Sequence, residues 1–360
     1  MGGVLVSPIT IKSGGGDYKV NFSTSLREFS EHINVENNFY IVDKFIYENY
    51  NIIKSKFSKN IVGILDPNEK IKTLKTIDEV SDRLIALGAN RTSNIVGIGG
   101  GFIQDISQFT SHIYHRGTGL ILVPTTLLSM ADSCMGGKCG ININQFKNQV
   151  GVFKSPKSIW IYDGFTKSLT TDLLIDGYGE ILKLLITKNK KETIKFLKFI
   201  NENIFNKEDL SKFIKLSLLS KKTVVEVDEY ERNERRILNY GHTFAHALES
   251  LSSNKIGHGQ AVGFGVNLAN FISFKMGYLD EKTFLEVLEL SYKIFNIENI
   301  QNRFIYEGQE FLKVFKTDKK TEGNHTNFIL CNDYGSLRIQ KLRLDNNLGS
   351  LIDEFYQINV

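Results

Sequence analysis

Polar side chains recur at helical spacing between residues 235 and 246. Arg235, Asn239, His242 and His246 follow one another at intervals of four, three and four residues. If the segment is a helix, these intervals place the four side chains along one stripe of its surface. Such a stripe in an otherwise apolar helix is costly unless it faces a ligand, a metal ion or water. The spacing therefore predicts a functional site, whereas a single histidine would more often be a hydrogen-bonded core residue.

A possible set of metal ligands extends beyond this segment. His258 lies 16 residues after His242, where another helix is expected to begin. Glu180 and Lys183, at i and i+3, share one face of an earlier predicted helix. One glutamate and two histidines form a donor set of catalytic zinc sites, which leave a position open for substrate. The alternative is a surface glutamate and two polar histidines in the core.

Two turns could bind a nucleotide. The glycines Gly99, Gly100 and Gly101 follow a predicted strand and precede a predicted helix that carries Asp105. Glycines at this place let backbone N–H groups approach a pyrophosphate at the helix N-terminus. An ordinary strand-to-helix turn is the alternative, because the spacing is not G-x-G-x-x-G. A second strand ends in two threonines that could face a ligand or cap the next helix, namely Thr125 and Thr126.

The two halves of the chain that must position these residues show different hydrophobic patterns. Short apolar runs with helical patterns between them predict a parallel sheet covered on both faces; they lie at 39–42, 61–65, 94–98, 119–123 and 158–162. Helical periodicity dominates from about Leu169 onward, and no proline follows Pro156. The sequence predicts an α/β fold, with a Rossmann-like domain over residues 1–168 and a mostly α-helical domain over residues 169–360.

Composition narrows the class of protein. The 360 residues carry a net charge of +4, spread along the chain, which suits a small anionic substrate better than nucleic acid. No run approaches the roughly 20 apolar residues of a membrane span, and the N-terminus shows no secretory pattern. Three cysteines form neither a disulfide framework nor a cysteine-rich metal site. We therefore expect a cytoplasmic protein with reduced thiols and no membrane partner.

Eight short motifs follow one another in order along the chain. They are Gly99-Gly100-Gly101-x-x-x-Asp105, Tyr114-x-Arg116-Gly117, Val123-Pro124-Thr125-Thr126, Asp132-Ser133-x-x-Gly136-Gly137-Lys138, Lys147-Asn148-x-x-Gly151, Gly179-Glu180-x-x-Lys183, Asn239-x-Gly241-His242-Thr243-x-x-His246 and His258-Gly259. The ordered set resembles the 3-dehydroquinate synthase family of sugar-phosphate cyclases. The resemblance runs from about Asp43 to Lys320.

The resemblance implies an architecture and a reaction. It implies an N-terminal NAD-binding domain, a C-terminal helical metal-binding domain, an active site in the cleft between them, and a homodimer. One divalent ion, zinc or cobalt, would be held by Glu180, His242 and His258. The family converts 3-deoxy-D-arabino-heptulosonate 7-phosphate to 3-dehydroquinate and phosphate in the shikimate pathway of aromatic amino acid biosynthesis. Transient oxidation by NAD permits loss of phosphate, and ring opening and an internal aldol step follow.

The resemblance also assigns roles to individual residues. The expected phosphate ligands are Lys138, Asn148, Asn239 and Arg116, the last reaching over from a partner subunit. A substrate carboxylate would meet Lys221 and Arg235, while ring hydroxyls and proton transfers would involve Asp132, Lys183 and His246. A C-terminal lysine is also expected at the substrate, with Lys320 favoured over Lys319. The NAD-contacting positions would be Asp43, Glu69, Lys72, Gly100, Gly101, Asp105, Thr125, Thr126, Asp132, Lys138, Lys147, Phe165, Ser168 and Leu169.

Departures from the family pattern leave the substrate open. Gln104 and Gln108 replace two glycines and are expected to alter NAD packing. Gln260 and Leu173 each stand where a glutamate is usual, and Ala245 stands where a glycine is usual. The alternatives are a cyclase for an aminodehydroquinate-type or sedoheptulose 7-phosphate substrate, a metal-dependent polyol dehydrogenase, and a catalytically silent NAD-binding homologue. A sedoheptulose phosphate has no carboxylate, so the presence of Lys221, Arg235, Asn239 and His246 favours a carboxylated substrate.

Overall fold

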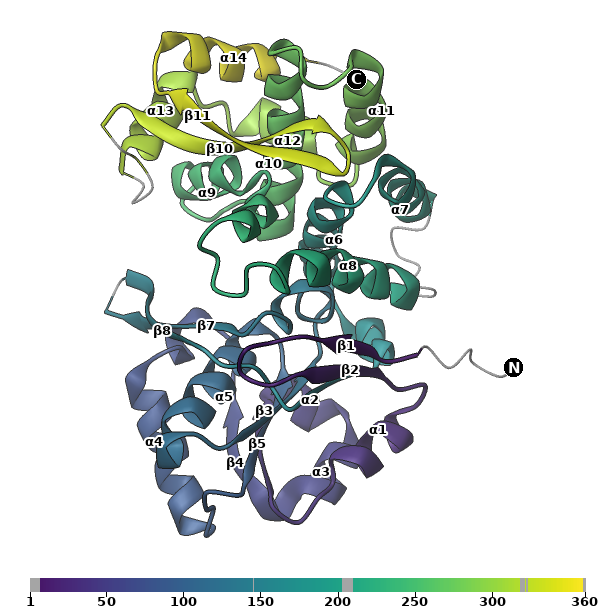
Figure 1. The fold of residues 1–360 in the computed structure, drawn as a ribbon, viewed down its shortest axis with the longest axis vertical. Coiled ribbons are helices and arrows are strands. Elements are labelled where there is room, and N and C mark those ends of the chain that lie inside the picture. Colours follow the sequence, from purple (N-terminus) through teal and green to yellow (C-terminus); the bar gives the residue numbers. More distant parts are fainter. Residues whose placement is uncertain (1–6, 145, 203–209, 318–320, 322, 359–360) are drawn as a thin grey trace. The chain divides into compact units, whose positions relative to one another are not determined.

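The computed structural model describes residues 7–144, 146–202, 210–317, 321 and 323–358. The chain forms two compact units, labelled by element in Figure 1. Unit 1 comprises residues 1–169 together with residues 222–230, and unit 2 comprises residues 170–221 and 231–360. Unit 1 therefore includes a short segment from the second half of the chain.

A seven-stranded sheet forms the centre of unit 1. Its strand order is β1-β2-β9-β6-β5-β3-β4, and every pairing is parallel except that of β1 with β2. The strands are β1 (Ile9–Ile11), β2 (Tyr18–Phe22), β3 (Asn38–Asp43), β4 (Ile61–Leu65), β5 (Asn94–Gly99), β6 (Gly119–Pro124) and β9 (Ser158–Ile161). The five strands predicted from apolar runs are all present, and the predicted parallel sheet is confirmed.

Helices cover both faces of this sheet because its strands are apolar on both sides. Figure 1 shows α4 and α5 on one side and α1 and α3 on the other. The helices are α1 (Leu26–Ile33), α2 (Lys44–Asn49), α3 (Asn51–Phe57), α4 (Leu74–Ala86) and α5 (Gly101–Ile113). On one face Ile41 packs in a cluster with Val80 of α4 and Ile103 of α5. On the opposite face Tyr40 stacks on Phe57 of α3.

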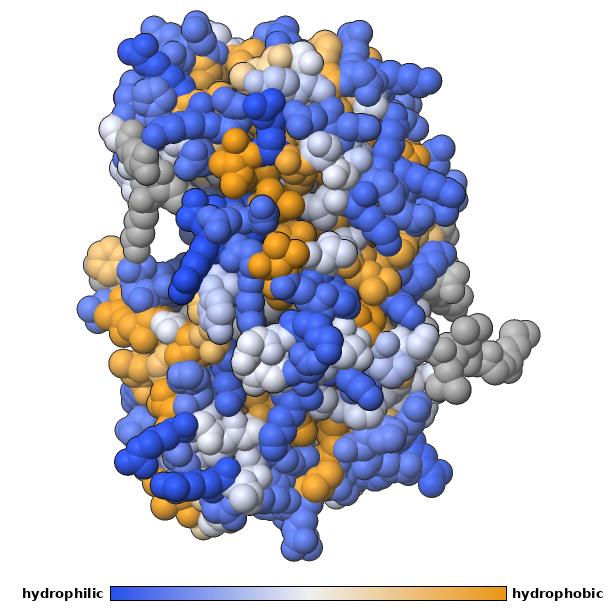
Figure 2. Space-filling model, in the orientation of Figure 1, coloured by the Kyte–Doolittle hydropathy of each residue, from blue (hydrophilic) through white to orange (hydrophobic). Residues whose placement is uncertain are grey.

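A separate hairpin lies beside α5. It consists of β7 (Lys138–Ile143) and β8 (Phe146–Phe153), which pair antiparallel. Phe146, Val150 and Phe153 of β8 are exposed, and Figure 2 shows a hydrophobic area over this hairpin. The returning segment 222–230 packs on the end of the hairpin, because Phe153 meets Tyr230 edge to face at a centroid distance of 5.2 Å.

The returning segment is attached to unit 1 mainly through one carboxylate. Glu229 accepts hydrogen bonds from Ser13 Oγ at 2.5 Å, from the Gly14 N–H at 2.8 Å and from Ser155 Oγ at 3.2 Å. A second carboxylate in the segment, Glu226, accepts from the Lys12 N–H at 2.6 Å. These bonds explain why the segment belongs to unit 1 rather than to the helices that flank it in sequence.

Unit 2 is built around one buried helix. Every residue of α10 from Ala261 to Ser273 is buried, as expected for a helix that is surrounded on all sides. The helix α10 spans His258–Lys275, and the elements in contact with it are α6 (Thr171–Ile186), α9 (His242–Leu251), α11 (Glu281–Tyr292), α12 (Ile297–Arg303), α14 (Asn346–Tyr356) and β10 (His325–Asp333). The unit also contains α7 (Lys190–Glu202), α13 (Gly308–Thr317), β11 (Ser336–Arg343) and most of α8 (Leu210–Val225). The β10–β11 hairpin is the one sheet described in this mostly helical unit. Among the described residues, no helix is both long enough and apolar enough to cross a membrane.

The single helix expected over residues 235–246 is wrong. A 3₁₀ helix covers Glu234–Asn239, and α9 begins only at His242. Between them Gly241 has φ +76°, and a Cβ there would lie 2.7 Å from the backbone N of Val266. The chain turns at this point because only glycine permits both that conformation and that approach to α10. The histidines and the Arg235–Asn239 pair therefore belong to different elements.

Candidate functional site

Three helices of unit 2 bring together a glutamate and two histidines. Glu180 lies on α6, His242 opens α9 and His258 opens α10. Glu180 Oε1 is 2.9 Å from His258 Nε2 and 3.3 Å from His242 Nε2. One donor atom from each residue lies within 4.8 Å of the others, and no other His, Cys, Asp or Glu trio meets this criterion among the described residues. The structure thus places the three predicted metal ligands side by side.

Glycine contacts between helices make this convergence possible. A Cβ on Gly259, beside His258, would lie 2.1 Å from the carbonyl oxygen of Ile175 on α6. A Cβ on Gly179, beside Glu180, would lie 2.9 Å from the Gly259 carbonyl oxygen. On α10, a Cβ on Gly265 would lie 2.3 Å from the carbonyl oxygen of Gly241, which precedes α9. The helices are in backbone contact at these glycines. The neighbouring side chains of Glu180, His242 and His258 can therefore reach one another.

Charges around the trio are closely balanced. Burial alone would raise the pKa of Glu180, but Lys183 and His242 outweigh burial and hold the pKa well below its usual range. The Lys183 ammonium forms an ion pair with Glu180 Oε2. His258 Nδ1–H donates to Glu249 Oε1 at 2.9 Å. Burial opposes the His258 imidazolium, yet its hydrogen bonds with Glu180 and Glu249 raise its pKa to about 10.

The trio fits a divalent ion in its donor chemistry. One carboxylate and two imidazoles are a common catalytic zinc set, and they leave a fourth position for substrate. Glu180 Oε2 is fully buried and accepts no hydrogen bond among the described residues, although it is ion-paired. Glu249 orients His258 through the ring nitrogen remote from Glu180, as carboxylates commonly do for metal-bound histidines. A bound ion would replace the proton that Glu180 and His258 share.

The other predicted site residues of unit 2 differ in their neighbours and in their burial. The His246 ring is exposed and stands 5.4 Å from the His242 ring, between centroids. The Asn239 side chain donates to Glu231 Oε1 at 3.0 Å, although no motif had singled out Glu231. Arg235 and Lys221 are buried cations at 3% and 6% exposure. Lys319 and Lys320 lie outside the described residues.

In unit 1, Lys72 joins two predicted sites. Its ammonium lies 2.7 Å from Asp105 Oδ2 and donates to Asn148 Oδ1 at 2.7 Å. Asp105 Oδ1 in turn accepts from the Gly140 N–H at 3.2 Å. Burial raises the pKa of Asp105, and Lys72 opposes that rise. An expected cofactor lysine and aspartate therefore meet an expected phosphate ligand.

A second set of contacts continues from Asn148. Its backbone N–H donates to Asn142 Oδ1 at 2.8 Å, and Asn142 Nδ2 donates to Glu69 Oε1 at 2.7 Å. Lys147 Nζ lies 3.8 Å from Glu69 Oε2. Asn142 was not predicted as a site residue, and its position in sequence gives no signal for it. Glu69, Lys147 and Asn148 are thus connected in one polar network.

The glycine turn has the tight packing that a ligand-binding turn requires. Gly100 caps α5, and a Cβ on it would lie 3.0 Å from Thr126 Cγ2. The Thr125 N–H donates to the Gly99 carbonyl oxygen at 3.2 Å. Thr126 Oγ1 accepts the Ser129 N–H at 3.2 Å, so the helix-capping alternative for this threonine is present in the structure.

The remaining predicted cofactor residues occupy the neighbouring strand ends. Asp43 caps α2 by accepting from the Phe45 N–H at 2.8 Å, and burial raises its pKa. The Phe165 ring is fully buried in the core, so this residue offers a ligand only its backbone. Ser168 Oγ accepts from Tyr50 Oη at 3.0 Å. The other members are Gly101 at the start of α5, a half-buried Asp132, an exposed Lys138 and Leu169, the last residue of the first segment of unit 1.

Arg116 occupies a strained turn on the surface of unit 1. Its φ is +64°, and the neighbouring His115 has φ +51°, a conformation that is unusual for residues with a side chain. Two departures from the family pattern lie in unit 2: Leu173 is exposed on the first turn of α6, and Gln260 is half-buried on the first turn of α10. Neither replaces a member of the metal-ligand trio.

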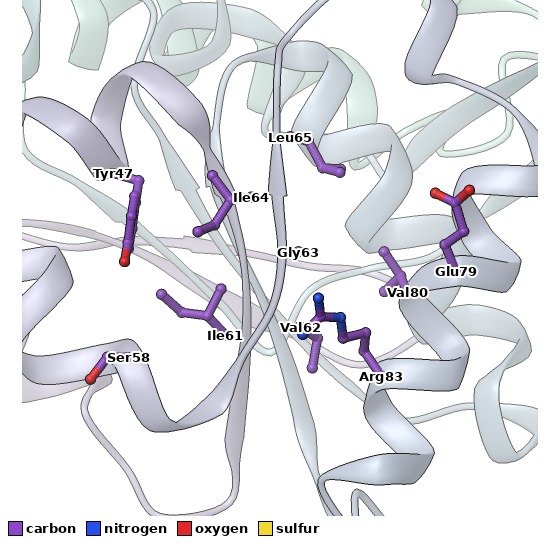
Figure 3. A pocket seen from close by; sticks show the side chains of 10 residues that line it. All are labelled: Tyr47, Ser58, Ile61, Val62, Gly63, Ile64, Leu65, Glu79, Val80 and Arg83. Atoms are coloured by element: carbon purple, nitrogen blue, oxygen red, sulfur yellow. The ribbon is translucent and has the colours of Figure 1, made fainter.

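A groove elsewhere on unit 1 contains none of the predicted residues. It runs along the edge strand β4, between α2 and α4, as Figure 3 shows. Its lining is mixed, because apolar residues of β4 face the charged side chains of Glu79 and Arg83. The groove is therefore separate from the polar network around Lys72.

Family models match most of the chain. A model described as 3-dehydroquinate synthase N-terminal matches residues 53–176, and one described as 3-dehydroquinate synthase C-terminal matches residues 177–321. The 3-dehydroquinate synthase of Campylobacter concisus is 34% identical over 342 residues, covering 92% of this chain and 94% of the relative. The 3-dehydroquinate synthase of Picrophilus torridus is 34% identical over 330 residues, covering 91% of this chain and 93% of the relative.

Solved structures with the same fold extend over nearly the whole chain. A 2-deoxy-scyllo-inosose synthase, complexed with carbaglucose-6-phosphate, NAD⁺ and Co²⁺, superposes with a TM-score of 0.84 at 24% identity, covering 97% of this chain and 99% of that one. A 2-epi-5-epi-valiolone synthase from Streptomyces hygroscopicus, with NAD⁺ and Zn²⁺ bound, gives 0.81 at 20% identity, covering 97% and 98%. At these identities the two structures establish the fold alone.

Proposed function

The chain belongs to the 3-dehydroquinate synthase family, and on this premise we propose that it converts 3-deoxy-D-arabino-heptulosonate 7-phosphate to 3-dehydroquinate and phosphate. The resemblance drawn from the motifs is thereby confirmed at the level of the family. The observation that carries the proposal is the meeting of Glu180, His242 and His258, each on a different helix. Their chemistry is what activation of a sugar hydroxyl requires.

We propose NAD and one divalent ion, zinc or cobalt, as the bound groups. Fold relatives bind NAD⁺ with Co²⁺ or Zn²⁺, which supports this choice. When bound, the ion lowers the pKa of a substrate hydroxyl, and the dinucleotide accepts and returns a hydride. Lys72, Asp105 and the glycine turn would hold the dinucleotide in unit 1.

The chain's own side chains have roles that follow from their chemistry. Lys183, which is ion-paired with Glu180, would donate to a ring oxygen of the substrate. His246 is exposed next to His242 and would move protons to and from the substrate. Arg235 and Lys221 would bind the substrate carboxylate, with the guanidinium supplying two parallel hydrogen bonds. Asp132 would hold a ring hydroxyl, while Lys138, Asn148 and Asn239 would bind the phosphate.

Another sugar-phosphate cyclase activity is the principal alternative. The fold matches synthases that are named for inosose and valiolone products. The curated relatives at 34% identity, which are named 3-dehydroquinate synthase, favour the carboxylated substrate. Retention of Arg235 and Lys221, the residues expected to bind a carboxylate, also favours it. A silent NAD-binding homologue is disfavoured because the complete ligand trio is in place. We further propose a homodimer in the cytoplasm, with Arg116 serving the partner's phosphate site.

One assay tests the proposal against each alternative. Purified protein is stripped with EDTA, and Zn²⁺ or Co²⁺ is restored together with catalytic NAD⁺ and the heptulosonate phosphate. We expect phosphate release with no net NADH, and loss of the activity in His258→Ala. Turnover of sedoheptulose 7-phosphate instead would establish the alternative cyclase. Accumulating NADH would indicate a simple dehydrogenase, and no reaction with either sugar would reject a cyclase.

A further inference from the structure

Two buried amides lie on α5 where no proposed catalytic role uses them. Gln104 and Gln108 are one helical turn apart and are each 3% exposed. Residues at i and i+4 stand above one another on the same side of a helix. A buried primary amide is costly unless its oxygen and nitrogen find partners. The partners of these two amides therefore show what the pair does.

Both amides hold the same short segment of chain. Ser133 Oγ donates to Gln104 Oε1 at 2.8 Å. Gln108 Nε2 donates to the carbonyl oxygen of Gly137, which also accepts the Lys154 N–H at 2.8 Å. The glutamine side chains thus attach segment 133–137 to α5 at both of its ends.

This segment needs such attachment because its turn is formed by glycines. Gly136 and Gly137 have φ values of +96° and +69° and no side chains that could pack, and the Gly136 N–H also donates to Tyr18 Oη at 3.2 Å. Asp132 and Lys138, two proposed ligand-binding residues, immediately flank the segment on either side. Any movement of the turn would displace both of them.

The Gln104 amide is only half satisfied. Its Nε2 atom is buried and has no hydrogen-bond partner among the described residues. Ser133 is exposed, and its hydroxyl lies 3.9 Å from the Cβ position of Gly101, at the N-terminus of α5. A helix N-terminus attracts anionic oxygens. If the hydroxyl proton turned to such an oxygen, a rotated Gln104 amide could donate Nε2–H to Ser133 Oγ in place of the bond that Oε1 now accepts.

We propose that Ser133 binds an anionic oxygen of the dinucleotide, and that Gln104 and Gln108 are positioning residues that hold Ser133, Asp132 and Lys138 for that purpose. The proposal rests on the proposed function only in naming NAD as the ligand. It accounts for the attachment of a glycine turn to α5 at both ends.

Affinity for NAD⁺ separates this arrangement from ordinary packing. Titration calorimetry with NAD⁺ should show affinity falling about tenfold in Ser133→Ala, the scale of one hydrogen bond to a charged oxygen. Gln104→Met should give a similar loss, and the double variant should be no worse than either single variant. Ser133→Thr keeps the hydroxyl and should restore affinity. Additive losses, or unchanged affinity in Ser133→Ala, would overturn the Ser133 contact.

Gln108 is tested by exchange and kinetics. Gln108→Met should speed amide hydrogen exchange in residues 133–140 and lower kcat about tenfold, short of the ~100-fold that a displacement of 1 Å can cost. Its Co²⁺ affinity should change less than twofold, because the metal ligands lie in unit 2. Equal exchange in variant and wild type would overturn the positioning role.

A matched variant separates positioning from general destabilisation. Gln301 in unit 2 is also a buried amide, donating to the Phe355 carbonyl oxygen at 2.8 Å. Gln301→Met should lower stability without changing NAD⁺ affinity or exchange in residues 133–140; the same changes there would overturn the proposal. If wild type binds NAD⁺ but turns over no sugar, the proposed function fails while these measurements still decide the inference. If wild type does not bind NAD⁺, the Ser133 contact is rejected and exchange alone decides the roles of Gln104 and Gln108.

Discussion

The ion pair between Glu180 and Lys183 gives a quantitative test of the metal centre in its metal-free form. Both side chains are 5% exposed, so neither can recover its hydration if the other is removed. Removing one member of such a buried pair costs about 3–5 kcal/mol of unfolding free energy. Glu180→Gln should show that full cost, because it leaves Lys183 and a protonated His258 facing an uncharged amide.

The two members of the pair should not be equivalent. In Lys183→Met the Glu180 carboxylate still faces His258, whose pKa is raised to about 10 and which is therefore charged near neutral pH. We expect a smaller cost for this variant, about 1–3 kcal/mol. The double variant should be less destabilised than the sum of the two, with a coupling of about 1–3 kcal/mol.

Urea unfolding in EDTA measures this cycle directly. The exposed pair Lys275 and Glu354, at 33% and 49% side-chain exposure, is the matched control, and its single variants should each cost less than about 1 kcal/mol. Additivity of Glu180→Gln and Lys183→Met within about 0.5 kcal/mol would refute the idea that these charges stabilise each other.

Three further results are expected. Gly259→Ala should lower unfolding free energy by about 1–3 kcal/mol and weaken Co²⁺ binding, because the new methyl would lie 2.1 Å from the Ile175 carbonyl oxygen; intact Co²⁺ affinity would count against the helix contact. Since Co²⁺ must displace a proton from His258, whose pKa is about 10, apparent Co²⁺ affinity should rise about tenfold per pH unit near neutrality, and a flat profile would contradict this. Lys72→Met should raise the pKa of Asp105 further, because Lys72 opposes the rise caused by burial. The variant's loss of unfolding free energy in urea should be largest at high pH and shrink as the pH falls through the pKa of Asp105. A loss that does not change with pH would argue against the pair.

The sequence was most informative where one physical rule acts locally. Continuous apolar runs predicted the five parallel strands because a strand covered on both faces cannot alternate. The helical spacing over residues 235–246 gave a wrong prediction, because the chain turns at Gly241 where it packs against α10. One helix ends before this turn and the next begins after it. Nothing in local spacing reports such a contact between distant segments.

Supporting residues were harder to find than ligands. Glu249 lies seven residues after His242 on α9, a spacing of two turns that places both on one face and could have indicated a partner for a histidine. Asn142 gave no comparable signal, because its role depends on β7 lying beside Glu69 and Asn148 in three dimensions. The departures Gln104 and Gln108 were expected to alter NAD packing, and the structure shows them bonded to segment 133–137.

Because residues 222–230 belong to unit 1, neither unit is encoded by one continuous stretch of the gene. A gene fragment that stops after residue 169 would encode Ser13, Gly14 and Ser155 without Glu229, their common acceptor. The complementary fragment, which begins at residue 170, would encode residues 222–230 without the residues of unit 1 that bind them. Recombination between residues 169 and 170 would therefore exchange two incomplete units. Only the continuous chain supplies both Glu229 and the groups that donate hydrogen bonds to it.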